Sequence, residues 1–281
     1  MRIPRKISIG KSVAVALLLA APLGAAHGAP STVDDRLTLG LNGESLTGTN
    51  GGGGGYAGWL HNFSDSALAG AAVEHQSLAN AHWTFGSLNG AYTFGPGDRR
   101  YSFYGEVHEG GGNSGNRSLQ YHVEAVGAIA TFDHRLSLQL EDKQFYVDTV
   151  SGNLPKLNVS YLWNPHLQTA LGYAYSAGSN LGTRLASGRF DVYEPLINLF
   201  GGFSVGQATA AALSYFGTPA QTSVPGLRLK EGYVGATLPL PSIRSEVSLV
   251  FDYQDLSSRL VHSRRMQGNL NYVVHIGHHG S

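Results

Sequence analysis

The sequence predicts an all-β fold, a closed antiparallel transmembrane β-barrel of about fourteen strands, and twelve or sixteen strands also fit the pattern. Three observations support this prediction. Apolar and polar residues alternate with the period of two that is typical of strands. Turn segments alternate between short and longer kinds, as in barrels that span a membrane. Charged residues make up only 14% of the 281 residues, against roughly 25% in soluble domains.

The composition also excludes several classes of protein. Basic and acidic residues tie at 19 each, so there is no electrostatic reason to expect a nucleic acid partner. The 42% apolar content argues against disorder. After residue 30, no apolar run approaches the roughly 20 residues of a spanning helix. Cysteine is absent, so an exported chain must be stabilised without disulfides, and a closed sheet without free edges would do this.

The first 28 residues have the pattern of a secretory signal peptide. Four basic residues lie within positions 2–11, an apolar stretch covers 13–21, and small residues frame a cleavage site at Ala26-His27-Gly28. We therefore expect a leader at 1–28 and a barrel domain at 29–281. The leader holds four of the 19 basic residues and none of the 19 acidic ones, so 15 basic residues remain in the barrel.

The strands follow from alternating segments after residue 35. Leu157, Val159, Tyr161 and Trp163, for example, alternate with a more polar set that includes Lys156 and Asn158. An even strand number returns the chain to the side where it began, as single-chain bacterial barrels require. The predicted strands cover 35–46, 56–64, 67–78, 82–94, 100–108, 117–132, 135–148, 156–164, 167–176, 195–205, 208–216, 227–238, 243–254 and 266–277.

The connections between these strands are short on one side and longer on the other. Short turns are expected at 64–66, 95–98, 133–134, 164–166, 206–207 and 239–241, and these would face the periplasm. Longer loops rich in Gly, Ser and Asn are expected at 47–55, 109–116, 150–155, 177–182 and 217–226. The glycine run at 51–55 is interpreted as a flexible loop. The segment 183–195 is the candidate for a loop that constricts the lumen, and changes of phase predict bulges in 82–94 and 227–238.

Aromatic residues gather at the expected strand ends, where they predict two girdles at the membrane interfaces. One set falls near the short turns and the other nearer the long loops. The expected girdle residues are Phe63, Phe94, Tyr101, Phe132, Trp163, Trp83, Tyr175, Tyr215 and Tyr253.

These patterns resemble the general class of Gram-negative outer-membrane β-barrels, including porin-like channels and the YaiO-like barrels of surface-polysaccharide systems. The resemblance covers nearly the whole chain after the leader and rests on pattern, without a diagnostic motif. It implies a location in the cell outer membrane, contact with outer-membrane lipid and lipopolysaccharide, and insertion by the outer-membrane assembly machinery. Such barrels commonly end on an aromatic residue, whereas this chain ends His278-His279-Gly280-Ser281.

The polar phase of the strands predicts the lining of a lumen. A barrel of this size holds water, so its inner wall must be polar in places. Mixed charges of both signs would make a weakly selective pore for small solutes, which is the leading functional prediction. The expected lumen-lining residues are Glu106, His108, His122, Glu124, Arg135, Gln139, Glu141, Lys156, Asn158, Glu246 and Asp252.

Two other functions remain open at this point. One is a component of a surface-polysaccharide export or modification system, which would have periplasmic export proteins as partners. The other is a lipid hydrolase in which His108 is the base and Ser114 the nucleophile. Barrel lipases place a serine two residues after the histidine, where this chain has Gly110, so we expect no enzyme. We also expect no cofactor and no metal, because His275, His278 and His279 would form only a loose terminal cluster.

Overall fold

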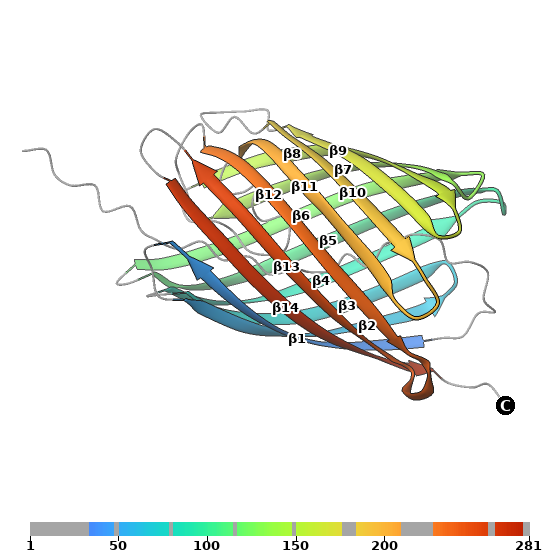
Figure 1. The fold of residues 1–281 in the computed structure, drawn as a ribbon, viewed down its shortest axis with the longest axis horizontal. Helices are drawn as coiled ribbons and strands as arrows, with labels where there is room; N and C mark the ends of the chain where they lie inside the picture. The colour runs from blue at the N-terminus through green and yellow to red at the C-terminus, as the bar shows by residue number, and fades with distance from the viewer. Residues whose placement is uncertain are drawn as a thin grey trace, which may run out of the picture.

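A computed structural model describes residues 34–47, 51–78, 81–114, 117–147, 150–175, 184–208, 227–257 and 262–277. Over these residues the chain forms fourteen antiparallel strands in one closed barrel (Figure 1). The strands are β1 (Asp34–Leu46), β2 (Gly52–Ser64), β3 (Ala67–Leu78), β4 (Ala81–Phe94), β5 (Arg99–Ser114), β6 (Arg117–Phe132), β7 (Leu136–Val147), β8 (Val150–Asn164), β9 (Leu167–Tyr175), β10 (Arg184–Tyr193), β11 (Asn198–Ala208), β12 (Leu227–Leu240), β13 (Ser245–Ser257) and β14 (His262–Gly277).

Each strand pairs with its neighbours in sequence, and β14 closes the sheet against β1. The closing register runs from Asp34 opposite Gly277 to Leu46 opposite Arg265. Closure leaves no strand with an unpaired edge, and this satisfies the backbone amides inside a bilayer. In the part of the chain that is described, a 3-10 turn, η2 (Pro241–Ile243), joins β12 to β13, and no helix is long and apolar enough to cross a membrane.

The strand number and the antiparallel closure confirm the predicted fold class, but the strand boundaries between residues 183 and 208 differ from the prediction. The segment 183–195, expected as a constricting loop, is instead β10 and belongs to the wall. The next turn lies at 194–197, where Glu194 and Ile197 exchange backbone hydrogen bonds. The predicted turn at 206–207 lies within β11, with Gly206 opposite Leu185. Most of the expected strand 208–216 lies outside the described residues, as does the predicted leader.

Several predicted loops are also part of the wall. Residues 52–55 of the glycine run begin β2, residues 109–114 complete β5, and residues 150–155 begin β8. Glycine serves a packing purpose in this run, because a Cβ on Gly54 would lie only 2.3 Å from the carbonyl oxygen of His75. The strands therefore continue beyond the apolar segments by which the sequence identified them.

The bulges expected in the middle of β4 and β12 are absent from the described pairing of both strands. Phe85 is buried and Leu88 is exposed, so these two residues lie on opposite faces of a regular strand. Register shifts occur instead at Asn62/Ser64 and Leu162/Asn164, beside short turns.

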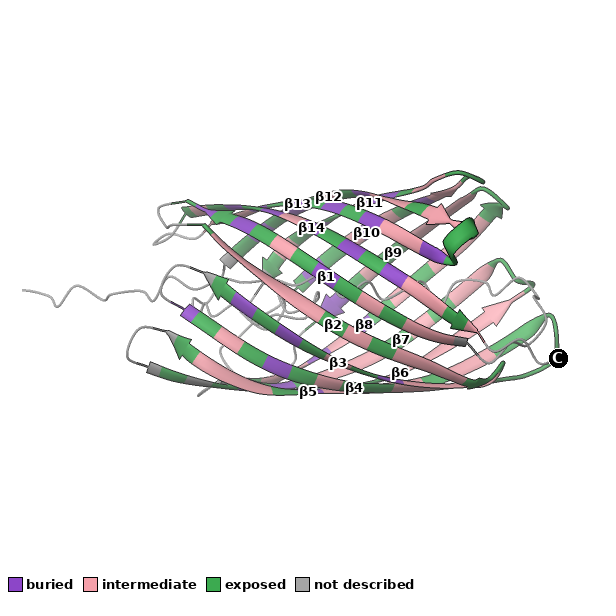
Figure 2. Ribbon diagram, turned by 90° about the horizontal axis from the view of Figure 1, so that it is seen from below, coloured by how far each residue is buried: buried purple, intermediate pink, exposed green. Residues whose placement is uncertain are grey.

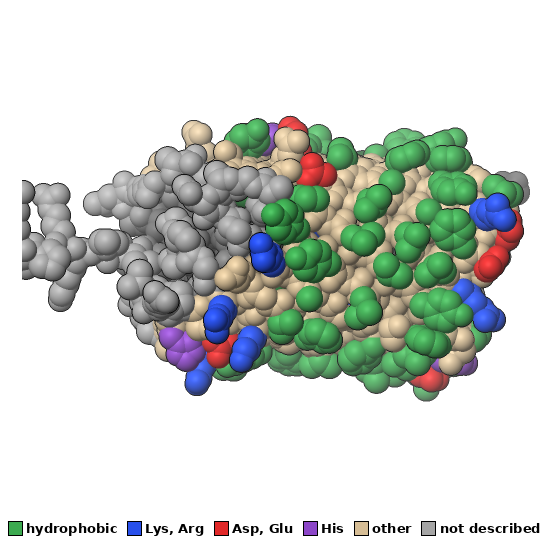
Figure 3. All heavy atoms as spheres, turned by 90° about the horizontal axis from the view of Figure 1, so that it is seen from above, with side chains coloured by type: hydrophobic (Ala, Val, Ile, Leu, Met, Phe, Trp, Pro, Cys, Tyr) green, Lys and Arg blue, Asp and Glu red, His purple; other side chains and the backbone are tan. Residues whose placement is uncertain are grey.

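The outer face of the barrel is apolar. Along β1, Leu37, Leu39 and Leu41 are all exposed, while Gly40 and Glu44 on the other face are buried. Figure 2 shows this alternation of buried and exposed residues along most strands, and Figure 3 shows hydrophobic side chains spread over the middle of one outer face. An exposed apolar belt around a closed barrel is the surface that lipid acyl chains cover.

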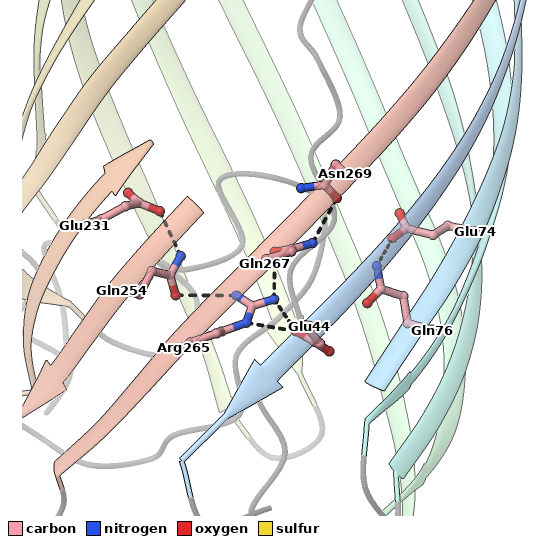
Figure 4. Close-up of polar contacts among 8 residues, drawn as sticks. All are labelled: Glu44, Glu74, Gln76, Glu231, Gln254, Arg265, Gln267 and Asn269. Atoms are coloured by element: carbon pink, nitrogen blue, oxygen red, sulfur yellow. Dashed lines mark hydrogen bonds and ion pairs between the residues drawn. The ribbon is translucent and has the colours of Figure 1, made fainter. Parts of the chain in front are cut away.

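A buried ion pair spans the seam between the first and last strands. Arg265 of β14 is 2% exposed, and its Nε and Nη2 donate to Oε2 of Glu44 on β1 at 2.8 and 2.6 Å (Figure 4). The guanidinium also donates to the side-chain oxygens of Gln267 and Gln254. These hydrogen bonds compensate for the desolvation of both charges, because a charge buried alone is costly.

The apolar belt can be tested with a matched pair of arginine substitutions on one strand. We expect Leu39→Arg to destabilise the barrel by roughly 2–4 kcal/mol, the cost of a cation in the apolar belt. Ser45→Arg lies on the same face but near the end of the barrel opposite the short turns, which we call the loop end. This variant should cost roughly 0–1 kcal/mol. Urea unfolding in lipid vesicles, followed by gel mobility, measures both. Equal losses from the two variants would contradict the assignment of the belt.

The seam ion pair predicts a second stability difference. Arg265→Met should cost about 3–5 kcal/mol because it leaves the Glu44 carboxylate buried and uncompensated. The double variant Arg265→Met/Glu44→Leu should recover most of this loss. Arg264→Met, a change at the exposed neighbouring residue, should stay within about 0.5 kcal/mol of the unchanged protein. The same unfolding assay applies, and a double variant no more stable than Arg265→Met would argue against the pair.

Candidate pore lining

Apolar side chains gather on the inner wall near the loop end of the barrel, beside buried polar residues such as Glu44 and Arg265. Eleven inward-facing or buried apolar side chains contributed by nine strands form this surface, which we call the apolar lining. Its members are Leu46, Trp83, Phe85, Tyr121, Val123, Phe145, Leu154, Ala174, Leu185, Leu229 and Leu256. Because lipid cannot reach them, their burial shows that the lumen is not polar throughout.

The aromatic part of the apolar lining comes from β4, β6 and β7. Phe85, Tyr121, Val123 and Phe145 form one buried cluster, and the Phe85 and Tyr121 rings lie 5.5 Å apart between centroids. Trp83 packs against this cluster and also against the leucine-rich group of β1, β8, β10, β12 and β13. Trp83 thus connects the two parts of the apolar lining.

A polar array lies on the inner wall of β5 to β8, farther from the loop end than the apolar lining. Gln139 donates to Tyr104 Oη at 2.6 Å, the Tyr104 hydroxyl donates to Glu141 at 2.7 Å, and Asn158 donates to Gln139 at 2.8 Å. On the same strands, Glu106 lies 3.3 Å from Lys143 Nζ and 3.5 Å from His108 Nε2. The array presents acidic and basic groups together to the interior.

A second polar array lies on the inner wall of β1 and β12 to β14. From Arg265, hydrogen bonds continue through Gln254 to Glu231 at 2.8 Å and through Gln267 to Asn269 at 3.0 Å (Figure 4). On the outer face of the same strands, a hollow of about 620 Å³ is lined mainly by outward-facing residues, among them Gly43, Gly232, Phe251, Met266 and Gly268. Glu74 and Gln76 on nearby β3 form a further buried pair, with a hydrogen bond of 2.5 Å.

A third inward group lies on β10 to β12. The Arg189 guanidinium donates to both carboxylate oxygens of Asp191 and lies 5.2 Å from the centre of the Phe200 ring. Phe200 packs with Val250 and Tyr233 in a small buried cluster. The segment 183–195, which was predicted to fold into the lumen as a loop, therefore contributes an ion pair from a strand of the barrel wall.

Most of the residues expected to line the lumen lie on the inward face of their strands, where their neighbours on the same face are buried. This holds for Glu106, His108, Gln139, Glu141, Lys156, Asn158, Glu246 and Asp252. Arg135 instead lies exposed in the turn between β6 and β7.

His122 and Glu124 do not lie inward as expected. They share the outer face of β6 with exposed Val126, and His122 forms ion pairs with Glu109 and Glu124 there. The sequence assigned Tyr121, Val123 and Ala125 to lipid because they are apolar, but these three residues are the buried inner face. The two faces of β6 were therefore predicted the wrong way round, because its inner face is the apolar one.

The expected aromatic girdle is divided by the structure. Near the short turns, Phe63, Phe94 and Trp163 are exposed, and Tyr101 and Phe132 are half-buried. Tyr175 and Tyr253 are exposed nearer the loop end. Trp83 instead belongs to the apolar lining, because it lies on the same face of β4 as buried Phe85. Tyr215 lies outside the described residues.

The pairs expected of a hydrolase or metal site are not assembled in the described part of the chain. His108 is buried beside Glu106, and the side chain of Ser114 lies outside what is described. Residues 278–281 also lie outside it. No group of three or more His, Asp or Glu side chains placed to hold a metal ion occurs among the described residues.

Sequence reasoning missed most of the loop-end interior. Arg265 lay just outside a predicted strand, and extending the alternation of β14 by one residue would have placed it inward. Glu44 lay within a predicted strand, on the face opposite Leu39 and Leu41, so its inward position could have been inferred. Phe85 and Phe145 carried no such signal, because an apolar residue on a strand is equally suited to lipid.

Comparison with known proteins finds likeness in fold alone. No protein-family profile matches the chain, and no curated protein is found similar to it. Among solved structures, the CymD monoaromatic hydrocarbon channel aligns over 88% of this chain and 90% of its own, with TM-score 0.61 and 9% identity. The toluene transporter TodX of Pseudomonas putida aligns over 88% and 89%, with TM-score 0.53 and 8% identity.

A FadL homologue of Pseudomonas aeruginosa also aligns, over 87% of this chain and 89% of its own, with TM-score 0.50 and 9% identity. These structures share the fourteen-stranded closed architecture with this chain. The closed antiparallel sheet, the exposed apolar belt and the shared fold together show that this chain has the architecture of a membrane-spanning β-barrel.

Proposed function

We propose that this barrel is a channel for small solutes that contain an apolar part. The observation that carries the proposal is the apolar lining at the loop end, where wall side chains of nine strands point away from lipid. In a water-filled porin the inner wall is polar. An inner surface of leucine and aromatic side chains instead favours a solute with apolar surface to bury, and gives no advantage to a solute that stays fully hydrated.

The two sides of the wall differ in what they offer such a solute. The apolar lining would remove the apolar part of the solute from water, and the polar array of β5 to β8, farther from the loop end, would keep the rest of the interior hydrated. Mixed charges around Glu106, Lys143 and Arg265 would then favour solutes without a large net charge. CymD and TodX, which have this fold, are described as a monoaromatic hydrocarbon channel and a toluene transporter, and their descriptions agree with this substrate class.

Trp83 provides a direct test, because it is the interior tryptophan among three. In the reporter Trp59→Phe/Trp163→Phe, bromobenzene should quench the remaining fluorescence saturably as it enters the apolar lining. Adding Phe145→Gln should weaken the apparent affinity about tenfold, equivalent to roughly 1.4 kcal/mol of lost contact. Fluorescence titration of the protein in detergent measures both values.

The matched control is the reporter Trp59→Phe/Trp83→Phe, which keeps only Trp163 on the outer face, where it is 58% exposed. Its quenching should rise without saturation, as bromobenzene partitions into the micelle. Identical titration curves for the two reporters would defeat the proposal that apolar solutes bind inside.

Ion selectivity tests whether the interior conducts past the polar array. Glu106→Gln should lower the K⁺/Cl⁻ permeability ratio severalfold, because Lys143 and Lys156 would then face the interior with less negative charge nearby. Glu124→Gln removes the same charge from the outer face and should leave the ratio unchanged. Reversal potentials across planar bilayers in a KCl gradient measure this ratio, and equal shifts in both variants would refute the assigned lumen.

A further inference from the structure

Four basic side chains gather on the outer face at the loop end of β10, β12 and β14. They are Arg184, Arg228, Lys230 and Arg264, and all four are exposed. Figure 3 shows Lys and Arg side chains at this end, together with an acidic and a histidine side chain, just beyond the edge of the apolar belt. We call these four residues the basic cluster. Their location is at the boundary between acyl chains and headgroups of the outer leaflet.

The strand register holds the basic cluster together. Arg264 of β14 and Lys230 of β12 both pair with Asp255 of β13, so their Cα atoms lie about 10 Å apart, two strand spacings. Arg228 lies two residues before Lys230 on the same face, about 7 Å away. Arg184 and Arg228 are both paired with Gln207 of β11. The backbone thus sets the spacing of these four cations.

The basic cluster encloses one carboxylate, that of Asp255, which is the cross-strand neighbour of both Lys230 and Arg264, so four basic residues stand against one acidic residue. None of its four members forms an ion pair with an acidic side chain in the described ranges, and the nearby Asp255 instead lies 3.2 Å from His262. Arg184 contacts the face of the Tyr175 ring, at 6.0 Å from its centre. Charges left exposed together repel one another, so an anion bound among them would stabilise this arrangement.

The opposite side of the barrel carries the reverse charge at the same end. On the outer face of β5 and β6, Glu109 and Glu124 flank His122 and form ion pairs with it. That group places two carboxylates beside one imidazole, so it stays acidic on balance. The basic cluster is therefore a local feature of β10 to β14 and not a general property of the rim.

Space for an acyl chain adjoins the basic cluster. Gly232 lies two residues after Lys230 on the same outer face, and Gly43 and Gly268 lie on neighbouring strands. A Cβ built on Gly43 or Gly232 would meet nothing within 4 Å, and one on Gly268 would first meet the Phe251 ring at 3.7 Å. The apolar belt is thus hollowed where glycines replace side chains, with Phe251 and Met266 beside the hollow.

From this geometry we propose that the basic cluster binds the phosphorylated headgroup of lipopolysaccharide, with acyl chains over the glycine hollow. Guanidinium and ammonium groups would hold the phosphates by charge-assisted hydrogen bonds, and the hollow would accept apolar chains. The outer leaflet supplies an anionic glycolipid at this height, so the site needs no soluble partner. This site is independent of the solute that the lumen carries.

The test measures binding of phosphorylated lipid A to the full-length protein in detergent. Lys230→Gln/Arg264→Gln should weaken binding roughly thirty-fold, because each basic residue near an anionic lipid surface contributes about 1 kcal/mol. The control Arg99→Gln/Arg100→Gln removes two exposed cations from the short-turn end and should bind as the unchanged protein does. The exchanged variant Lys230→Arg/Arg264→Lys should also retain binding.

Two further ligands identify what the basic cluster recognises. Lipid A without its phosphates should bind at least tenfold more weakly, and inorganic phosphate alone should compete only poorly. Equal binding of the dephosphorylated lipid, or equal loss in the Arg99/Arg100 control, would overturn the proposal. Tight binding of inorganic phosphate would replace the lipid with a free anion. Heat-shifted gel mobility of each variant confirms that the barrel is folded.

Discussion

Closure of the sheet is the constraint on which the rest of this structure depends. Within a bilayer, an unpaired backbone amide costs several kcal/mol, so β14 must pair with β1. That seam joins residues more than 200 positions apart, from Asp34 with Gly277 to Leu46 with Arg265. The buried ion pair of Glu44 and Arg265 lies at its loop end. Because the pair supplies a charge from each strand, it gives the seam a side-chain specificity that backbone hydrogen bonds alone lack.

Once closed, the barrel has two faces with different demands. The outer face must be apolar across the membrane, and leucine and aromatic side chains meet that demand on every side. The inner face has no such requirement, since water can fill a lumen of this size. Apolar residues on the inner face are therefore informative, because neither closure nor insertion explains them. Phe85, Tyr121 and Phe145 fall in this class, and they pack together on the inner face of β4, β6 and β7.

The same argument explains how much the sequence could predict. Fourteen strands could be counted because lipid-facing residues such as Leu157 and Val159 repeat with period two. Strand ends could not be placed, because Gly52 to Gly55 and Glu109 to Asn113 continue the ladder without an apolar signal. The predicted positions of β10 and β11 were displaced because Gly206 suggested a turn. In β6 the phase failed, since Val123 is apolar and inward while His122 is polar and outward. Pattern alone cannot separate an apolar lumen from lipid.

At the loop end, basic residues lie on one side of the barrel and acidic residues on the other, and the closed ladder fixes both groups in place. In a rigid ladder, residues of different strands keep fixed spacing, so Lys230 and Arg264 stand on either side of Asp255. On β5 and β6 the same ladder brings Glu109 and His122 together as a satisfied pair. One side of the rim therefore keeps its acidic residues in contact with a histidine. The other side presents four basic residues beside a hollowed apolar belt, and a ligand with both phosphate and acyl chains would match both features.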